Sequence, residues 1–159
     1  MTAIAITMRT ARPQDLATIQ HLLADSDLTT LGVADQMTHF VVAENAGTIV
    51  GCAGLEPYGT EGLLRSVAVH SDYRSRGIAA TLVAGLLDQA RRSGVRTVYL
   101  LTETAVGYFS RIGFQEIDRS RVDESVQQSL EFTTACCETA TVMRLALDGR
   151  PHAWMEERS

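Results

Sequence analysis

Cysteine is scarce in this chain, with only Cys52, Cys136 and Cys137 among its 159 residues. Their odd number and their spacing argue against a disulfide framework and against a structural zinc site. The composition therefore predicts a protein of a reducing compartment, the cytoplasm, that holds no metal.

Basic charge and long hydrophobic runs are also missing. The formal net charge is −5 at pH 7 and no basic stripe is present, which argues against a nucleic-acid partner. No apolar run approaches the roughly 20 residues of a membrane span, and the first residues lack the apolar stretch of a signal peptide. We expect small-molecule partners, with no nucleic acid and no membrane.

The length predicts one domain, residues 1–149, followed by a polar tail at residues 150–159. Hydrophobic periodicity predicts strands at residues 3–8, 39–43, 48–55, 63–69, 97–101, 114–117 and 139–147, and helices near residues 13–23, 77–93 and 105–112. Asn45-Ala46-Gly47 predicts a hairpin turn, and residues 56–62 predict a longer turn. This order predicts an α/β fold with a mixed sheet.

The most informative motif is a polar loop between a predicted strand and a predicted helix. The strand ends at Val67-Ala68-Val69, and Gly77 opens the long helix. Free backbone N–H groups and the positive end of the helix dipole favour an anion there, most simply a pyrophosphate. Arg74 and Arg76 add forked donors and positive charge. The loop lacks both the Walker ending and the three glycines of a dinucleotide fingerprint.

Arg74-Ser75-Arg76-Gly77-Ile78-Ala79, together with the later Arg111-Ile112-Gly113-Phe114, resembles the coenzyme A loop of the GCN5-related N-acetyltransferases (GNAT). The alternative is an ordinary basic turn that caps a helix. The resemblance extends from about Ile6 to Leu147 and implies an acyl-CoA N-acyltransferase fold with a splayed central sheet and acetyl-CoA as co-substrate. The cofactor-binding residues that it implies are Val67, Ala68, Val69, Arg74, Ser75, Arg76, Gly77, Ile78, Ala79, Ala80, Thr102 and Phe109.

Several stretches, among them residues 54–59, 63–69 and 109–114, look like the arsenic-resistance-associated N-acetyltransferases. That family is similar to enzymes that acetylate the α-amine of phosphinothricin and arsinothricin. The resemblance implies a small, anionic, amino-acid-like acceptor and direct transfer in a ternary complex. Similar proteins are commonly homodimers, so we also expect a homodimer here.

Two positions depart from the common family pattern. Arg65 occupies a site where many members carry a glutamate, and Phe109 a site where many carry a tyrosine that acts as general acid. Tyr108 lies one residue earlier, which turns its side chain by about 100° on a helix. The proton carriers must therefore be sought among other residues, and the candidates are Glu56, Glu61, Glu103 and Tyr108.

Strand alternation places Arg65 on the face of Leu63, Val67 and Val69, and Ser66 on the other face. Arg65 could bind an anionic group of the acceptor, or it could form a structural ion pair. The candidate acceptor-binding residues are Arg65, Ser66, Glu131 and Phe132. The last two lie in residues 119–137, where the spacing predicts an extra helix before the last strand that roofs the acceptor site, packs, or contacts a second copy.

The preferred hypothesis is an N-acetyltransferase for a small anionic amine. The alternative is a coenzyme A-binding sensor or accessory resistance protein with little transferase activity, and acetylation of a peptide is a third possibility. Cys136-Cys137 could capture an arsenical, but adjacent cysteines are more simply small packing residues.

Overall fold

The computed structural model describes residues 6–127, 129 and 139–147. Glu131, Phe132, the pair Cys136-Cys137 and the tail at 150–159 lie outside the described residues. The chain forms two compact units. The first unit comprises residues 1–55 and 65–86, and the second comprises residues 56–64 and 87–159. A single domain over residues 1–149 stays a prediction.

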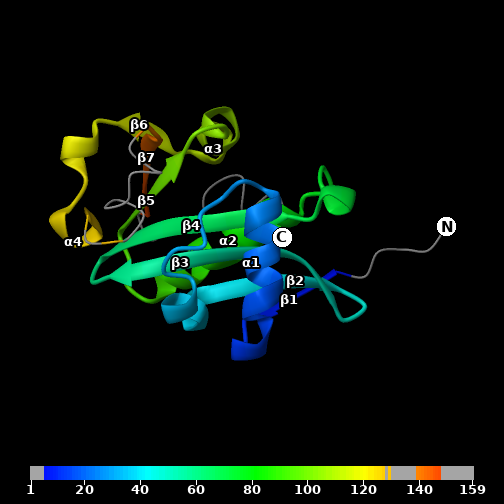
Figure 1. Cartoon of the computed structure of the whole chain (residues 1–159). Helices are drawn as coiled ribbons and strands as arrows, with labels where there is room; N and C mark the ends of the chain where they lie inside the picture. Colours follow the sequence, from blue (N-terminus) through cyan, green and yellow to red (C-terminus); the bar gives the residue numbers. More distant parts are fainter. Residues whose placement is uncertain (1–5, 128, 130–138, 148–159) are drawn as a thin grey trace. The chain divides into compact units, whose positions relative to one another are not determined.

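The order of strands and helices, with three consecutive strands between the first two α-helices, is the one that the hydrophobic pattern predicts (Figure 1). The strands are β1 (Ile6–Thr10), β2 (Phe40–Asn45), β3 (Thr48–Tyr58), β4 (Glu61–Val69), β5 (Thr97–Thr102), β6 (Gln115–Ile117) and β7 (Thr141–Ala146). The α-helices are α1 (Leu16–Asp25), α2 (Ile78–Arg92), α3 (Val106–Ile112) and α4 (Glu124–Gln127). Short 3₁₀ helices are η1 (Pro13–Asp15), η2 (Ala34–His39), η3 (Ser71–Tyr73) and η4 (Arg119–Arg121).

The strands follow the order β1-β2-β3-β4-β5-β7-β6 in a mixed sheet. β1 with β2, β2 with β3, β5 with β7, and β6 with β7 are antiparallel, whereas β4 and β5 are parallel. The predicted hairpin turn is confirmed, because Ala46 and Gly47 have φ values of 51° and 85° between β2 and β3.

The chain reverses direction between β3 and β4 in fewer residues than the sequence predicts. The predicted turn covers residues 56–62, but β3 continues to Tyr58 and β4 begins at Glu61. Gly59 has a φ of 68°, which allows a tight reversal over two residues. Glu56 therefore lies within a strand rather than in a loop.

The core of the first unit lies between α1 and the strands. Figure 1 shows α1 on one face of these strands and α2 on the other. The buried cluster is Ala11, Ile19, Leu22, Leu23, Val33, Met37, Phe40, Val42, Cys52 and Ala68. On the α2 side, a Cβ added to Gly51 would lie 3.3 Å from Ile78 Cγ2 and 3.3 Å from Leu82 Cδ1. Gly51 thus allows α2 to pack closely onto β3.

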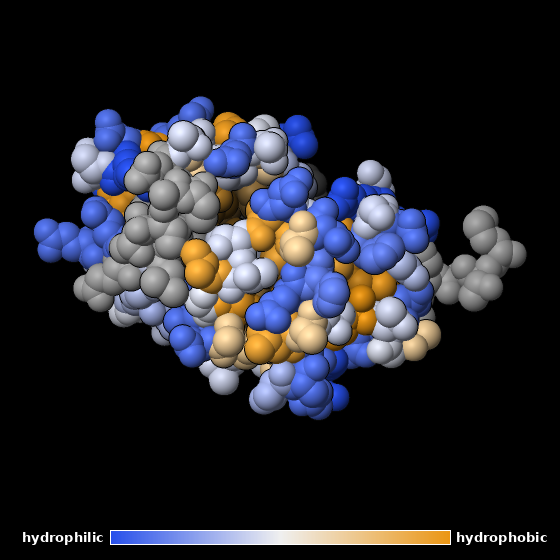
Figure 2. All heavy atoms as spheres, viewed as in Figure 1, coloured by the Kyte–Doolittle hydropathy of each residue, from blue (hydrophilic) through white to orange (hydrophobic). Residues whose placement is uncertain are grey.

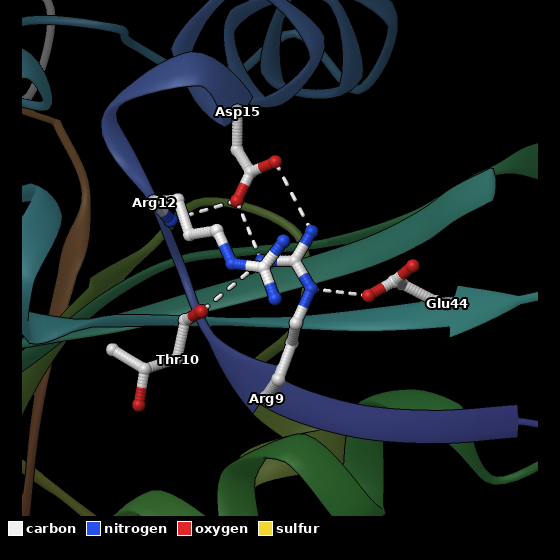
Figure 3. Close-up of polar contacts among 5 residues, drawn as sticks. All are labelled: Arg9, Thr10, Arg12, Asp15 and Glu44. Atoms are coloured by element: carbon white, nitrogen blue, oxygen red, sulfur yellow. Dashed lines mark hydrogen bonds and ion pairs between the residues drawn. The ribbon is translucent and has the colours of Figure 1, made fainter. Parts of the chain in front are cut away.

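A network of ion pairs joins strand β1 to the start of α1 (Figure 3). Arg9 donates from Nη1 and Nη2 to the two carboxylate oxygens of Asp15, at 2.7 and 3.1 Å. Asp15 Oδ2 also accepts the backbone N–H of Arg12 at 2.7 Å, and Arg9 Nε pairs with Glu44 on β2. The hydrogen bond from Arg9 is the largest of the contributions that lower the pKa of Asp15.

The core of the second unit consists of apolar residues from β4, β5, β7 and residues 119–127. Its buried members are Leu63, Tyr99, Val122, Val126 and Val142, with Tyr58, Leu101 and Ile117 packed against them. The predicted extra helix is confirmed only as one turn, α4, within the described residues. Val122 and Val126 face the core, as their spacing predicts.

The face of the molecule drawn in Figure 2 carries both polar and apolar residues. Figure 2 shows hydrophobic residues in orange among hydrophilic ones in blue. Leu28 and Leu31, in the loop after α1, are 40% and 45% exposed. Among the described helices, none has both the length and the apolar character needed to cross a bilayer.

Candidate functional site

The loop that joins β4 to α2 has an unusual backbone. Ser75 and Gly77 have φ values of 64° and 79° just before α2. Left-handed residues that alternate with right-handed or extended ones turn successive N–H groups toward one side and create an anion-binding concavity. The first N–H groups of α2 have no acceptor within the helix and add the positive end of its dipole. This backbone can hold a phosphate group.

The two arginines of the loop have different surroundings. Arg74 donates from Nε to the carbonyl oxygen of Val69 at 3.0 Å and from Nη2 to Ser26 Oγ at 3.3 Å. Arg76 is exposed, and its guanidinium carbon lies 5.9 Å from the ring centroid of Tyr73. Arg74 therefore braces the loop, whereas Arg76 presents its charge to solvent.

The structure brings together the predicted cofactor-binding residues of the first unit. Ala68, Val69 and Ile78 are buried, and Val67 is half-buried. Ala79 and Ala80 are half-buried in the first turn of α2. His70, which precedes η3, accepts the N–H of Asp72 at Nδ1 (3.1 Å) and is a turn residue.

Arg65 and Ser66 lie in β4 and are buried, with 3% and 7% exposure. The prediction that they face opposite sides is wrong. Ser66 has a φ of 59°, which interrupts the regular alternation of the strand. Arg65 Nε consequently donates to Ser66 Oγ at 2.9 Å, and its Nη2 donates to the carbonyl oxygen of Leu31 at 2.6 Å. Binding of an acceptor by either residue stays a prediction.

Cys52 lies beside this interruption of β4. Its Sγ donates to the carbonyl oxygen of Ser66 at 3.3 Å. Burial raises the pKa of the Cys52 thiol to about 12. The thiol is therefore protonated at neutral pH and is unsuited to nucleophilic catalysis.

In the second unit, Glu56 is a buried carboxylate with two hydroxyl donors. Its exposure is 3%. Oε1 accepts from the hydroxyl of Tyr58 at 2.5 Å and from Ser129 Oγ at 2.7 Å. The sequence predicts neither partner. Tyr58 could have been found from its i+2 position on the same strand, but no local pattern connects residue 129 with residue 56.

The other candidate bases have different environments. Glu103 is exposed and accepts from Thr139 Oγ1 at 3.0 Å. Glu61 has a raised pKa, mainly because of burial, although a hydrogen bond from Thr97 opposes the shift. The pKa of Tyr99 is also raised, mainly by burial. The negative charge of Glu61 raises it further. These surroundings distinguish Glu56 as the most buried of the three carboxylates.

The predicted aromatic and hydroxyl residues of the second unit take part in local packing. Phe109 is buried, with ring centroids 5.1 Å from Tyr108 and 5.7 Å from Phe114. Thr102 Oγ1 accepts the N–H of Ala105 at 3.0 Å and so shapes the turn before α3. Roles of Thr102 and Phe109 in cofactor binding, and of Tyr108 in proton transfer, stay predictions. Among residues 6–127, 129 and 139–147, no cluster of three or more His, Cys, Asp or Glu could hold a metal.

Comparison with known families identifies the chain. A family model described as the Acetyltransferase (GNAT) family matches residues 7–114. The chain belongs to the GNAT family. The resemblance predicted from the loop is thereby confirmed at the level of the family, while the arsenic-resistance subgroup stays a prediction.

Relatives of this GNAT chain include amino-acid acetyltransferases. It is 32% identical over 95 residues to the amino-acid acetyltransferase of Escherichia coli K12, a match that covers 58% of this chain and 21% of that protein. The corresponding match to the enzyme of Aliivibrio fischeri is 30% identical over 99 residues and covers 22% of it. The chain therefore spans about a fifth of the length of these curated relatives.

Solved structures confirm the predicted mixed α/β acyltransferase fold. Rv2747 from Mycobacterium tuberculosis, solved with CoA and a second ligand, shares 27% identity and a TM-score of 0.75, over 89% of this chain and 99% of that one. N-acetylglutamate synthase from Neisseria gonorrhoeae, solved with coenzyme A and N-acetyl-glutamate, gives a TM-score of 0.79 at 19% identity, over 92% and 36% of the two chains. Coenzyme A is thus the group bound by solved GNAT relatives, as the sequence resemblance implies.

Proposed function

We propose that this protein is an acetyl-CoA-dependent N-acetyltransferase that acts on the amine of a small, amino-acid-like molecule. The observation that carries the proposal is the loop before α2, where left-handed Ser75 and Gly77 precede the helix in a GNAT chain. Its relatives among the amino-acid acetyltransferases support an amino-acid-like acceptor.

The described residues fit coenzyme A at this loop. Acetyl-CoA, when bound, supplies a thioester-linked acetyl group. The backbone N–H groups of residues 75–80 hold the pyrophosphate, and the exposed Arg76 adds a charge-assisted contact. Arg74 keeps the loop in shape through its bonds to Val69 and Ser26.

Transfer to an amine requires one proton to leave the nitrogen and one to reach the departing thiolate. The amine nitrogen bonds to the thioester carbon while the carbon–sulfur bond breaks, in one complex of both substrates. We assign Glu56 as the acceptor of the amine proton, directly or through a water, with Glu103 as the alternative. Tyr108 is the candidate donor to the sulfur.

The finer substrate class that we propose is an anionic amino-acid analogue of the phosphinothricin or arsinothricin type, with a role in arsenic resistance. The sequence resemblance supports this class. Arg65 provides a buried positive charge that suits a carboxylate, phosphinate or arsonate, although its bonds to Leu31 and Ser66 also fit a structural role. A cytoplasmic homodimer completes the proposal.

The test is thiol release from acetyl-CoA across a panel of amines. The panel contains phosphinothricin, arsinothricin, methionine sulfoximine, ordinary amino acids, polyamines and aminoglycosides. Release with an amino acid or an analogue supports the proposal. Silence across the panel with acetyl-CoA binding intact favours the coenzyme A-binding sensor. Absence of acetyl-CoA binding contradicts both.

A further inference from the structure

The geometry points to Tyr58 and Ser129 as positioning residues that orient the Glu56 carboxylate for proton transfer. This inference rests on the proposed function, because it takes Glu56 as the acceptor of the amine proton. It adds two residues that position the carboxylate, and the sequence predicts neither of them.

Both hydroxyl groups bind the same carboxylate oxygen. The hydroxyl of Tyr58 lies 2.5 Å from Glu56 Oε1, and Ser129 Oγ lies 2.7 Å from it. Hydroxyl-to-carboxylate hydrogen bonds of about 2.5–2.7 Å are those in which the acceptor is ionised. Both hydroxyls therefore hold Oε1 through short hydrogen bonds.

A buried carboxylate needs such donors. Glu56 is 3% exposed, and Ser129 is 2% exposed. Moving an ionised carboxylate out of water costs much free energy unless hydrogen bonds replace the lost water. Because both hydroxyls donate to Oε1, they also limit rotation of the Glu56 carboxyl group. The lone pairs of the carboxylate therefore keep a fixed orientation.

The two donors reach Glu56 by different routes. Tyr58 is two residues further along β3, so its side chain leaves the same face of the strand. Ser129 follows α4 and is separated from Glu56 by 73 positions in the chain. Tyr58 packs against the same core cluster as Val122 and Val126, which anchor the segment that carries Ser129. One packing arrangement therefore holds both hydroxyls in place.

Orientation of this kind affects turnover more than binding. A general base contributes about 10²–10⁴-fold to rate when it is placed correctly. Small misplacements of reacting groups reduce rate steeply. Ser129 then affects turnover through its hydrogen bond to Glu56, in addition to any packing role.

The experiment compares Tyr58→Phe and Ser129→Ala in the full chain, assayed with acetyl-CoA and the best acceptor of the amine panel. The matched controls are Tyr99→Phe, which removes a buried phenol whose partner is the Asp123 backbone, and Ser125→Ala, which removes a hydroxyl bound to Asp123 Oδ1 at 2.6 Å. Thermal unfolding of all four variants separates loss of stability from loss of turnover.

We expect Tyr58→Phe and Ser129→Ala each to lower kcat by about 10-fold, with the KM for acetyl-CoA unchanged. We expect the two controls to keep kcat within about twofold of the wild-type value. Their loss of melting temperature should be similar to that of Tyr58→Phe and Ser129→Ala. In a Glu56→Gln background, Ser129→Ala lowers kcat by less than about twofold, because groups that act as one unit are not additive.

The contrary outcomes separate this inference from the proposed function. Normal kcat in Tyr58→Phe and Ser129→Ala, with a slow Glu56→Gln variant, overturns the inference and leaves Glu56 as the base. The inference is also overturned if the control variants lose as much kcat as Tyr58→Phe and Ser129→Ala. If Glu56→Gln is fully active, the Glu56 carboxylate is not the base, and Tyr58 and Ser129 have no role in proton transfer. A wild-type protein without turnover overturns the inference together with the proposed function.

Discussion

Arg65 and Ser66, adjacent residues of β4, are joined by a side-chain hydrogen bond from Nε to Oγ of 2.9 Å. Neighbours in a regular strand point to opposite faces and cannot make this bond. It forms because Ser66 has a left-handed backbone with a φ of 59°. The same turn exposes the Ser66 carbonyl oxygen to Cys52 Sγ.

Two substitutions at residue 66 separate backbone strain from the hydrogen bond. We expect Ser66→Ala to lower the free energy of unfolding by about 1–2 kcal/mol, because it loses the bond to Arg65 and keeps the left-handed penalty. Ser66→Gly loses the same bond but relieves the backbone, so it is more stable than the alanine variant by about 1 kcal/mol. Urea unfolding measures both. If the glycine variant is less stable than the alanine variant, the backbone at residue 66 is not strained.

Gly54 lies against the ring of Phe40. A Cβ at residue 54 would come within 2.5 Å of Phe40 Cε1 and 2.6 Å of Cζ. We expect Gly54→Ala to lower the free energy of unfolding by about 1–3 kcal/mol because the buried ring must shift. Urea unfolding measures the loss.

Gly85 is the matched control, since it lies on α2 and a Cβ there has nothing within 4 Å. Gly85→Ala should raise the free energy of unfolding by about 0.5–1 kcal/mol through helix propensity. Adding Phe40→Leu to Gly54→Ala should recover part of the loss. An unchanged Gly54→Ala variant would show that the ring moves freely.

The bond between Arg9 and Asp15 makes stability depend on pH. The pKa of Asp15 is lowered, chiefly by the hydrogen bond from Arg9. A carboxylate with a depressed pKa stabilises the fold fully above its unfolded value, about 3.9, and this contribution is lost as the pH falls through the folded value. We expect Asp15→Asn to lower the free energy of unfolding by about 1–3 kcal/mol at pH 7.

The difference between wild type and Asp15→Asn should shrink as the pH drops below about 4, since the wild-type carboxyl then becomes neutral too. Guanidinium unfolding at a series of pH values follows it. The exposed Asp35 provides the control, because Asp35→Asn removes a carboxylate without disturbing the β1–α1 junction. A difference that is constant from pH 7 to pH 3 would exclude the ion pair as the cause.

The loop arginines should respond differently to removal. Arg76→Ala is expected to raise the Kd for acetyl-CoA by about 10-fold or more, the loss of one charge-assisted contact worth about 1.5–3 kcal/mol. Arg74→Ala should in addition lower the melting temperature, because its bonds to Val69 and Ser26 disappear. Calorimetric titration and thermal unfolding measure the two effects.

Arg92 serves as the charge control for these variants. Its side chain is 71% exposed and pairs with Asp88 near the end of α2. Arg92→Ala removes one positive charge and should leave the Kd for acetyl-CoA unchanged. Equal weakening by Arg76→Ala and Arg92→Ala would mean that general charge, not the loop contact, attracts the cofactor.

The sequence by itself determined the features that depend on local chemistry. Gly47 and Gly77 favour the left-handed backbone of the turns that contain them, and apolar spacing specifies α1 and α2. The phosphate-binding loop belongs to this class, because its residues are contiguous. For the same reason the family could be predicted from the sequence before the fold was known.

Only the tertiary structure decided which side chains meet. The left-handed backbone at Ser66 occurs in a residue that favours no such conformation, so packing around β4 imposes it. The partnership of Glu56 with Ser129 spans 73 positions and depends on how Val122 and Val126 pack. Such contacts arise when apolar surface is buried between segments that are distant in the chain. Local sequence patterns therefore do not predict them.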